Sequence, residues 1–385
     1  MSRSPELLDD VAALDAGDRG EMLRAVASGA AQVREAARLT AEAGVDRLAD
    51  DGRPRAVLVC GAGGSAVAGD VLAAVAGDAS PVPVVVSRGP VLPAWAGPMD
   101  LVVAVSCSGS TRETLSALEE AVRRGCRLMV VGRAGSPLDD LGQRGRAVFV
   151  PVPQGRPSRA SLWALSTPLV LAGHALGLLS APPQDVEQTA SLLEQVADRC
   201  RRDADHLVNP GKRLAAHLDG ALPVVWGTSA VTGVAAARFA LQLNENAEVP
   251  AVWGLLPDAA HNQAMVLEGP AAPRVDAAGD PDDFFRDRAD DVEQAGSLAL
   301  VVLRDSDEHP QTAAYASSCL ELAREQQVPV LELHAEGRSP LARLASLVGL
   351  VDFASTYLAL LQGTDPTPVR AVERLRDRAA QVRPA

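Results

Sequence analysis

Short, uninterrupted apolar segments alternate with helical segments along the first half of the chain. The apolar segments lie at 56–61, 82–88, 101–106, 127–133 and 147–153. Their apolar side chains do not alternate with polar ones, which is typical of short strands buried on both faces of a parallel sheet. Helical patterns at 65–77 and 111–124 follow the first and third of these segments. The alternation predicts βαβ units and therefore an α/β fold with a parallel sheet.

The same alternation returns in the second half of the chain. Apolar segments lie at 222–229, 251–256, 298–304 and 328–335, and helical patterns lie at 232–247, 311–327 and 341–361. We therefore predict two doubly wound parallel-sheet units with flanking helices. The predicted units are 1–182 with N-terminal helices, a helical connection at 183–219, and 220–385 with C-terminal helices. The polar, acidic segment 270–296 is predicted to be a surface insertion.

Composition and charge narrow the class of protein. Hydrophobic residues make up 47% of the 385 residues, so a chain of this length is expected to form two domains with sizeable cores. The formal net charge of -13 argues against a nucleic-acid partner, which requires a clustered basic surface. The N-terminal residues lack an apolar signal segment, and no apolar run approaches the length of a membrane-spanning helix. We therefore expect a cytoplasmic protein with no membrane partner.

The cysteines do not form a recognisable framework. There are five, they are widely spaced, and no two form a C-x-x-C pair. This pattern fits neither a disulfide framework nor a zinc site, so no bound metal is expected. Cys60, Cys107 and Cys126 lie in or beside apolar segments and are predicted to be small buried side chains.

A dense group of hydroxyl side chains follows one of the predicted strands. The sequence VVAVSCSGSTRETL at 102–115 places Ser106, Ser108, Ser110 and Thr111 within six positions, just before a predicted helix. We call this group the serine loop. Hydroxyl and backbone N–H groups at a helix N-terminus converge on an anion, and the helix dipole favours negative charge there. The structural alternative is a Ser/Thr N-cap, for which one hydroxyl is enough.

A glycine turn follows the first predicted strand, in the sequence CGAGGSAVAGD. Gly63 and Gly64 precede Ser65 at the start of a helix, which lets a ligand approach the backbone closely. The turn departs from the G-x-G-x-x-G fingerprint, and Ser87 and Arg88 stand where an acidic residue would end the second strand, so no dinucleotide is expected. Ligands of an open α/β sheet bind beyond the carboxyl ends of its strands. Ser65 and the serine loop are therefore predicted to hold one phosphate group.

These two segments also resemble a known module. GAGGSAVAGD followed by SCSGSTRETL resembles the sugar-isomerase (SIS) domain, which binds phosphorylated sugars. Three further segments are similar to the bifunctional phosphoglucose/phosphomannose isomerase family: PQGRPSRASLWAL at 153–165, LNENAEVPAVWGLLPDAAHNQ at 243–263 and YLALLQGTDPTPVRAVERLR at 357–376. The resemblance covers nearly the whole chain and implies two SIS-type subdomains.

The resemblance implies an aldose–ketose isomerase that interconverts glucose 6-phosphate, mannose 6-phosphate or both with fructose 6-phosphate. It implies that the phosphate is bound by Gly63, Gly64, Ser65, Ser106, Ser108, Ser110 and Thr111. Glu245 would move the proton between C1 and C2, Arg159 would stabilise the enediolate, and His261 would help to open the sugar ring. In this family the histidine comes from the partner subunit, so a homodimer with a shared active site is implied. No cofactor or metal is implied.

The chemistry of isomerisation without a metal suits these residue types. Desolvation raises the pKa of a carboxylate toward that of a useful base, arginine stays charged beside an oxyanion, and histidine exchanges protons near neutral pH. Outside such motifs, a glutamate near the end of a helix is usually solvated, and a lone histidine usually has a structural role.

Arg376 departs from the family pattern. The family has a leucine–lysine pair where this chain has Leu375 and Arg376. Arginine keeps its proton near neutral pH, so Arg376 is a candidate substrate contact and cannot act as an acid or base. This change, with others around His261, leaves a second function open: a non-catalytic or weakly active sugar-phosphate-binding protein that acts as a sensor or partner. An isomerase acting on an amino-sugar phosphate is a third alternative.

Overall fold

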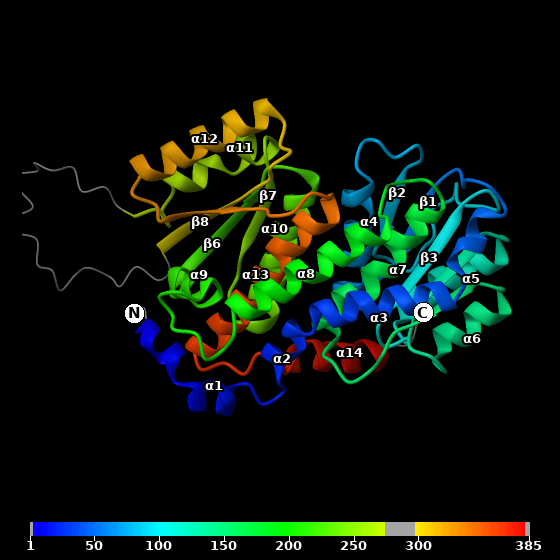
Figure 1. Cartoon of the computed structure of the whole chain (residues 1–385), viewed down its shortest axis with the longest axis horizontal. Coiled ribbons are helices and arrows are strands. Elements are labelled where there is room, and N and C mark those ends of the chain that lie inside the picture. The colour runs from blue at the N-terminus through cyan, green and yellow to red at the C-terminus, as the bar shows by residue number, and fades with distance from the viewer. Residues whose placement is uncertain (1–2, 274–296, 382–385) are drawn as a thin grey trace, which may run out of the picture.

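The computed structural model describes residues 3–273 and 297–381. Two parallel β-sheets lie at opposite ends of the molecule, with helices between and around them (Figure 1). The first sheet has the strand order β2-β1-β3-β4-β5, and the second has the order β7-β6-β8-β9. The predicted α/β fold with two parallel sheets is confirmed.

The strands closely follow the predicted apolar segments. The first sheet contains β1 (Val57–Cys60), β2 (Val84–Ser87), β3 (Leu101–Ser106), β4 (Arg127–Gly132) and β5 (Val148–Pro151). The second contains β6 (Ala221–Gly227), β7 (Val252–Leu255), β8 (Ser297–Arg304) and β9 (Val330–His334). Every residue of β1 and β3 is buried, because these inner strands are covered on both faces, and this explains their continuous apolar sequences.

Helices and short 3-10 helices (η) connect and cover the strands. The first half contains η1 (Pro5–Asp9), α1 (Val11–Gly17), α2 (Met22–Ala27), α3 (Gly29–Glu42), η2 (Val45–Ala49), η3 (Gly63–Ser65), α4 (Val67–Ala76), α5 (Arg112–Arg123), α6 (Pro137–Arg144), η4 (Ser158–Ala160) and α7 (Leu162–Ala175). The second contains α8 (Pro183–Arg199), α9 (Pro210–Leu218), α10 (Ala230–Asn246), α11 (Asp258–Asn262), η5 (Ala264–Glu268), α12 (Pro310–Glu325), α13 (Pro340–Leu361) and α14 (Arg370–Gln381).

Two buried helices differ from the sequence predictions. The hydrophobic pattern does not predict α7, because its residues 162–170 are buried on all sides and lack the 3.6-residue period of an amphipathic helix. The expectation that no segment approaches membrane-spanning length is wrong for α13, which has both the length and the apolar composition. However, 89% of the apolar 18-residue stretch of α13 is buried inside the protein. Helix α13 packs there against α8, α9 and α10 as a core helix.

The two halves of the chain share one apolar core. Its buried residues include Val71 of α4 and Trp163 of α7 from the first half, and Phe239 of α10 and Val351 of α13 from the second. Helix α10 packs against both α4 and α13, so it lies between the two sheets (Figure 1). The unit boundaries at 182 and 219 stay predictions, and the proposed insertion 270–296 falls almost entirely outside the described residues.

The strand order of each sheet reverses at the strand that comes first in the sequence, β1 or β6. In the first sheet, Val57 of β1 pairs with Val84 of β2 on one side and with Leu101 of β3 on the other. The point at which the order reverses therefore lies between β1 and β3, and ligands of such sheets bind outside the carboxyl ends of the strands at this point. In the second sheet, β6 has the same position between β7 and β8.

Candidate active site

The hydroxyl groups of the serine loop converge beyond the end of β3. The Ser106 Oγ lies 3.0 Å from the Thr111 Oγ1 and 3.5 Å from the Ser108 Oγ. The Ser110 hydroxyl donates a hydrogen bond to the Ser108 Oγ at 3.2 Å. Ser106 is buried, whereas Ser108 and Ser110 are exposed, so the hydroxyl cluster extends from the interior to the surface.

The serine loop is not explained by helix capping. Thr111 is the N-cap residue of α5, but its side chain makes no capping hydrogen bond. The Ser106 Oγ accepts a hydrogen bond from the Gly109 N–H at 3.1 Å. Gly109 has a φ of 68°, and a Cβ at this position would lie 2.0 Å from the Ser136 Oγ, so the loop requires glycine there. The turn at Gly109 therefore brings the hydroxyl groups together just before α5 begins.

The glycine turn after β1 meets the serine loop. The Cys107 N–H donates to the Ser65 Oγ at 3.4 Å, which joins the loops that follow β1 and β3. Gly63 has a φ of 55°, and a Cβ built at Gly64 would lie 3.9 Å from the Cα of Arg159. The residues predicted to hold a phosphate thus lie together, near the starts of α4 and α5, and Arg159 is beside them. Hydroxyl groups and helix N-termini in this arrangement suit an anion.

Arg159 is a buried cation held by several acceptors. Only 7% of the residue is exposed. Its Nε donates to the Asn246 Oδ1 at 2.6 Å, and its Nη2 donates to the carbonyl oxygens of Pro366 and, at 2.9 Å, Thr367. Burial lowers the pKa of Arg159 from its ordinary value, while the negative charges of Glu245 and Asp365 act in the opposite direction.

Glu245 reaches this region from the second half of the chain. It is the penultimate residue of α10 and is half-buried. The next residue, Asn246, is fully buried and binds Arg159 directly. The end of α10 therefore brings the predicted base to the guanidinium predicted to stabilise the enediolate, although the two residues lie far apart in the sequence.

Within the described residues of one chain, neither His261 nor Arg376 is bonded to Arg159. His261 lies on the surface in α11, where its ring packs edge-on against Tyr315 at a centroid distance of 5.5 Å. Arg376 lies on the exposed helix α14. Among the hydrogen bonds and ion pairs of the described residues, none joins either side chain to Arg159 or Glu245.

Sequence reasoning missed the buried polar residues around Arg159. Asn246, Arg238, Asp352 and Ser355 are all buried and hydrogen-bonded there. Asn246 lies within the NEN sequence singled out above, but no role was predicted for it. Arg238 and Asp352 occupy buried positions of α10 and α13, and charged residues are almost never fully buried unless paired. Their burial and pairing are seen only in the structure, because Arg238 and Asp352 lie 114 positions apart in the sequence.

The corresponding edge of the second sheet carries a carboxylate. Asp305 follows β8, and its Oδ2 accepts a hydrogen bond from the Ser229 hydroxyl at 2.6 Å. The Asp305 N–H donates to the Thr228 Oγ1 at 3.0 Å, so the loops that follow β6 and β8 are joined. The Arg343 Nε lies 2.7 Å from the Asp305 Oδ1. Hydroxyl groups surround this position too, but the anion between them belongs to the chain.

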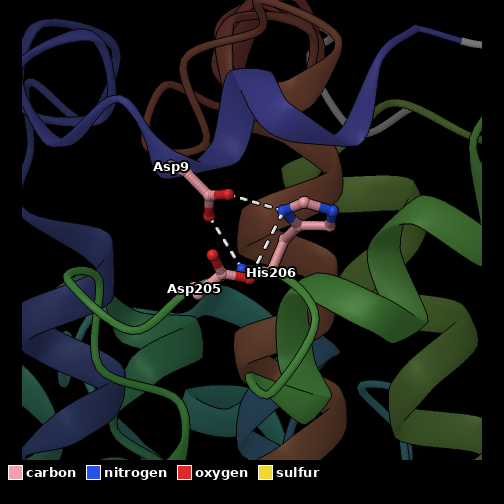
Figure 2. A group of neighbouring side chains, drawn as sticks. All are labelled: Asp9, Asp205 and His206. Atoms are coloured by element: carbon pink, nitrogen blue, oxygen red, sulfur yellow. Dashed lines mark hydrogen bonds and ion pairs between the residues drawn. The ribbon is translucent and has the colours of Figure 1, made fainter.

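Asp9, Asp205 and His206 form a separate cluster in which three potential metal-ligand atoms lie within 4.8 Å of one another (Figure 2). The His206 Nδ1 lies 2.5 Å from the Asp9 Oδ2, and the buried Lys212 Nζ donates to the Asp9 Oδ1 at 3.3 Å. Burial works to raise the pKa of Asp9, but the hydrogen bonds from His206 and Lys212 hold it below its ordinary value. The Asp9 carboxylate is thus bound by the Lys212 ammonium and the His206 imidazole, and the cluster links η1 to the segment before α9. We call this cluster the clasp.

Comparisons with known proteins find similarity to phosphoglucose isomerases and to a solved structure with the same fold. A family described as bacterial phospho-glucose isomerase C-terminal SIS domain matches residues 207–378. A bifunctional phosphoglucose/phosphomannose isomerase of Aquifex aeolicus is 28% identical over 84% of this chain and 90% of its own length. A solved structure of a hypothetical protein from Thermus thermophilus shares the fold, with a TM-score of 0.68 and 18% identity over 98% of this chain and 95% of that one.

A further relative establishes the family. The bifunctional phosphoglucose/phosphomannose isomerase of Caldicellulosiruptor bescii is 30% identical over 327 residues, which cover 85% of this chain and 90% of the relative. The resemblance predicted from the five sequence segments is therefore confirmed along the chain as a whole. With two parallel sheets, an SIS-type hydroxyl loop and this extended identity, the chain belongs to the bifunctional phosphoglucose/phosphomannose isomerase family.

Proposed function

We propose that this protein is a sugar-phosphate isomerase that interconverts glucose 6-phosphate, mannose 6-phosphate or both with fructose 6-phosphate. One observation carries the proposal: Arg159, which is hydrogen-bonded to the residue directly after Glu245, lies beside two hydroxyl-bearing loops at the carboxyl edge of the first sheet. The names of the family relatives, which include both activities, support the same substrates.

The phosphate group is bound by the serine loop and the glycine turn after β1. Ser65, Ser106, Ser108 and Thr111 supply hydroxyl groups, and Gly63 and Gly64 let the anion approach the backbone. These contacts act on a part of the substrate that does not change during the reaction. They therefore contribute to binding substrate and transition state equally, and they orient C1 and C2 toward Glu245 and Arg159.

Glu245 is the base of the proton transfer. In the aldose-to-ketose direction its carboxylate removes the proton from C2, the C–H electrons form the C1–C2 double bond, and the O1 oxygen becomes negative. Arg159 remains protonated and stabilises that oxyanion. The O2 hydroxyl proton is then transferred to O1, and Glu245 returns the C2 proton to C1, which completes the ketose with no net gain or loss of protons. Base assistance of this kind contributes roughly 10²–10⁴-fold to the rate.

Ring opening is assigned to His261 of a second subunit. The surface around His261 supports this assignment, because it exposes large apolar side chains of the edge strand β7 and of η5: Val252, Trp253, Leu255, Met265 and Val266. Exposed apolar patches and unpaired edge strands are typical of surfaces that bind another chain. The homodimer with a shared active site therefore remains part of the proposal.

A subunit-mixing experiment tests the shared site. Dimers of Glu245→Gln and dimers of His261→Ala should each be nearly inactive. After subunit exchange, half of the dimers are mixed, and each mixed dimer contains one site with both residues intact. Activity should recover to about a quarter of the wild-type value. No recovery, with exchange confirmed by differently tagged subunits, would contradict the shared site.

Proton exchange followed by NMR tests the activity itself. The protein is incubated in deuterium oxide with glucose 6-phosphate and then with mannose 6-phosphate, while C2–H and fructose 6-phosphate are monitored. Deuterium uptake with ketose formation is expected, and Glu245→Gln should lower the rate by at least about 10²-fold. Glu248→Gln is the matched control, because Glu248 is exposed and lies beyond the end of α10.

A non-catalytic sugar-phosphate-binding protein is the second candidate. It is favoured by Arg376, which cannot exchange a proton near neutral pH, and by His261, which makes no hydrogen bond or ion pair with Glu245 among the described residues. The same NMR experiment separates the two functions. Shifts of the substrate phosphorus signal without deuterium uptake would identify a binding protein, and uptake would identify the isomerase.

A further inference from the structure

A closed ring of buried hydrogen bonds holds Arg159. The Arg159 Nε donates to the Asn246 Oδ1 at 2.6 Å, and the Asn246 Nδ2 donates to the Ser355 Oγ at 2.9 Å. The Ser355 hydroxyl in turn donates to the Asp352 carbonyl oxygen at 2.9 Å. This half of the ring links η4, the end of α10 and the core helix α13.

The other half of the ring returns to the backbone of Arg159. The Asp352 carboxylate binds Arg238 through two contacts, 2.9 Å to Nε and 2.7 Å to Nη2. The same Arg238 Nη2 donates to the Arg159 carbonyl oxygen at 2.8 Å. Each ring residue is at least nine-tenths buried, so the position of Arg159 is fixed at both its main chain and its side chain.

The direction of the ring is set by Ser355. A hydroxyl has one proton, and that of Ser355 is used on the Asp352 carbonyl oxygen, so the Ser355 Oγ can only accept from Asn246. The Asn246 amide must then turn its NH₂ group toward Ser355 and its oxygen toward Arg159. Asn246 is thereby oriented as the acceptor that the Nε of Arg159 requires.

These contacts leave one end of the guanidinium available. The Nε is used by Asn246, and the Nη2 is used by the carbonyl oxygens of Pro366 and Thr367. The Nη1 makes no hydrogen bond within the part of the chain that the structure describes. A planar guanidinium fixed through two of its three nitrogens cannot rotate, so the direction of the Nη1 protons is fixed as well.

We propose that Asn246 and Ser355 are positioning residues for the reaction: they orient Arg159 so that its Nη1 donates to the oxyanion of the enediolate. This inference rests on the proposed isomerase function. Asn246 directly follows Glu245, so the last turn of α10 sets the position of the base and the orientation of the cation together. Small displacements matter at such a site, because a shift of about 1 Å in a reacting group costs roughly 10²-fold in rate.

The first test replaces the amide. Asn246→Leu removes the acceptor and should lower kcat by roughly 10²-fold while KM changes less than about threefold, because the phosphate contacts remain intact. Asn246→Asp keeps an oxygen acceptor for the Arg159 Nε and should retain more of kcat than Asn246→Leu. Equal losses in kcat for the two variants would contradict the proposal.

The second test uses a matched pair of neighbouring hydroxyls. Ser355 and Thr356 are both fully buried in α13, and both donate to the Asp352 carbonyl oxygen at 2.9 Å, but only Ser355 contacts Asn246. Ser355→Ala should lower kcat by about tenfold, and Thr356→Val should leave kcat within about twofold of the wild type. Equal effects on kcat would show that the hydroxyls only stabilise α13, and the proposal would be wrong.

A spectroscopic measurement separates this inference from the isomerase proposal. The Arg159 Nε–H should give a slowly exchanging nitrogen-15 NMR signal, assigned by its absence in Arg159→Lys. In Ser355→Ala this signal should shift and exchange faster, whereas in Thr356→Val it should not change. If the wild type is inactive but the signal behaves in this way, the ring is supported and the isomerase proposal fails. If activity is present and Ser355→Ala leaves both the signal and kcat unchanged, the positioning role fails alone.

Discussion

The carboxyl edges of the two sheets have the same topology and different chemistry. At the first edge, the serine loop hydroxyls bond to one another and to backbone N–H groups, and no carboxylate is hydrogen-bonded to them among the described residues. At the second edge, hydroxyls also gather, but the Asp305 carboxylate lies among them and is paired with Arg343. The first edge is the one at which we propose phosphate binding, whereas the second edge holds a carboxylate of the chain itself.

The difference in charge between the two edges shows that sheets of the same topology can carry different chemistry. The reversal of strand order places two loops side by side in each sheet, those after β1 and β3 and those after β6 and β8. Hydroxyl groups and helix N-termini make both positions suitable for negative charge. A carboxylate that already occupies such a position repels a second anion and compensates the local dipoles. The carboxylate of Asp305, directly after β8, is thus a difference between the two edges that bears on anion binding.

The largest expected effect comes from removing hydroxyls at the first edge. Ser106→Ala combined with Thr111→Val deletes two groups predicted to bind the phosphate. Hydrogen bonds to a charged group contribute about 1.5–3 kcal/mol each, so the affinity for glucose 6-phosphate should fall by about 10²–10⁴-fold. Titration calorimetry with glucose 6-phosphate measures this loss.

The equivalent change at the second edge is the control. Ser229→Ala combined with Thr228→Val removes hydroxyls that contact Asp305 and its N–H. The affinity for glucose 6-phosphate should stay within about twofold of the wild type, since no external ligand binds there. Equal losses of affinity in the two double variants would show that both edges contribute to substrate binding.

The next largest effect is a loss of stability when the carboxylate at the second edge is removed. Asp305→Asn leaves Arg343, which is 7% exposed, without its nearest carboxylate, and breaking a buried pair in this way costs about 3–5 kcal/mol. Urea denaturation should show this loss in the free energy of unfolding, with KM for the sugar phosphate unchanged. Adding Arg343→Met should restore much of the stability. If it does not, the unpaired charge of Arg343 is not the cause of the loss in Asp305→Asn.

A smaller effect should follow when the first edge is made to resemble the second. Ser108→Asp places a carboxylate on the exposed side of the serine loop, where it repels the phosphate. KM should rise by about tenfold, and the increase should shrink with added salt because the charge is exposed to solvent. Ser108→Asn, similar in size but uncharged, is the control. A KM increase of the same size in Ser108→Asn would point to steric rather than electrostatic interference.

The smallest expected effect is a pH dependence of stability, which an ionisable pair such as Asp9 and His206 produces and a hydroxyl group does not. Asp9, like Asp305, is a carboxylate held by cations, and its hydrogen bond raises the pKa of His206 above the ordinary 6.5. The contribution of His206 to stability is therefore present below pH 6.5 and is lost as the pH rises through the raised value. The lowered pKa of Asp9 makes its contribution present above pH 3.8 and lost on further acidification.

The clasp should therefore stabilise the protein most between these two limits. His206→Gln should lower the free energy of unfolding by less than about 1 kcal/mol near pH 5.5, because the pair is partly exposed. The difference from the wild type should disappear near pH 9, as urea denaturation at the two pH values can show. A difference that grows between pH 5.5 and pH 9 would contradict the assignment.

Much of the fold could be predicted because it depends on local patterns. The segment predicted at 101–106 is β3 without a shift of either end, since a strand buried on both faces must be apolar throughout. Helix α7 was missed for the related reason that burial on all sides removes the helical period. Cys60, Cys107 and Cys126 are buried as predicted, and five thiols lie in the interior without bonding to one another.

The candidate site was predicted in part. Ser65 and the serine loop could be placed at one edge from their positions after two strands, and the structure brings them into contact. The surroundings of Arg159 were not predictable, because Asn246 lies 87 positions away and its partner Ser355 lies 109 positions further along. The packing of His261 against Tyr315 also required the tertiary structure.

The sequence by itself determined the strands, most helices and the hydroxyl groups that follow β1 and β3, because these depend on the apolar period and turn residues of short segments. Only the tertiary structure decided that β1 lies beside β3, that α10 brings Glu245 to Arg159, and that Asp305 fills the second edge. Those contacts join residues distant in the chain. They follow from packing α4, α10 and α13 into one core, where the free energy is a sum over many side chains rather than a property of any segment.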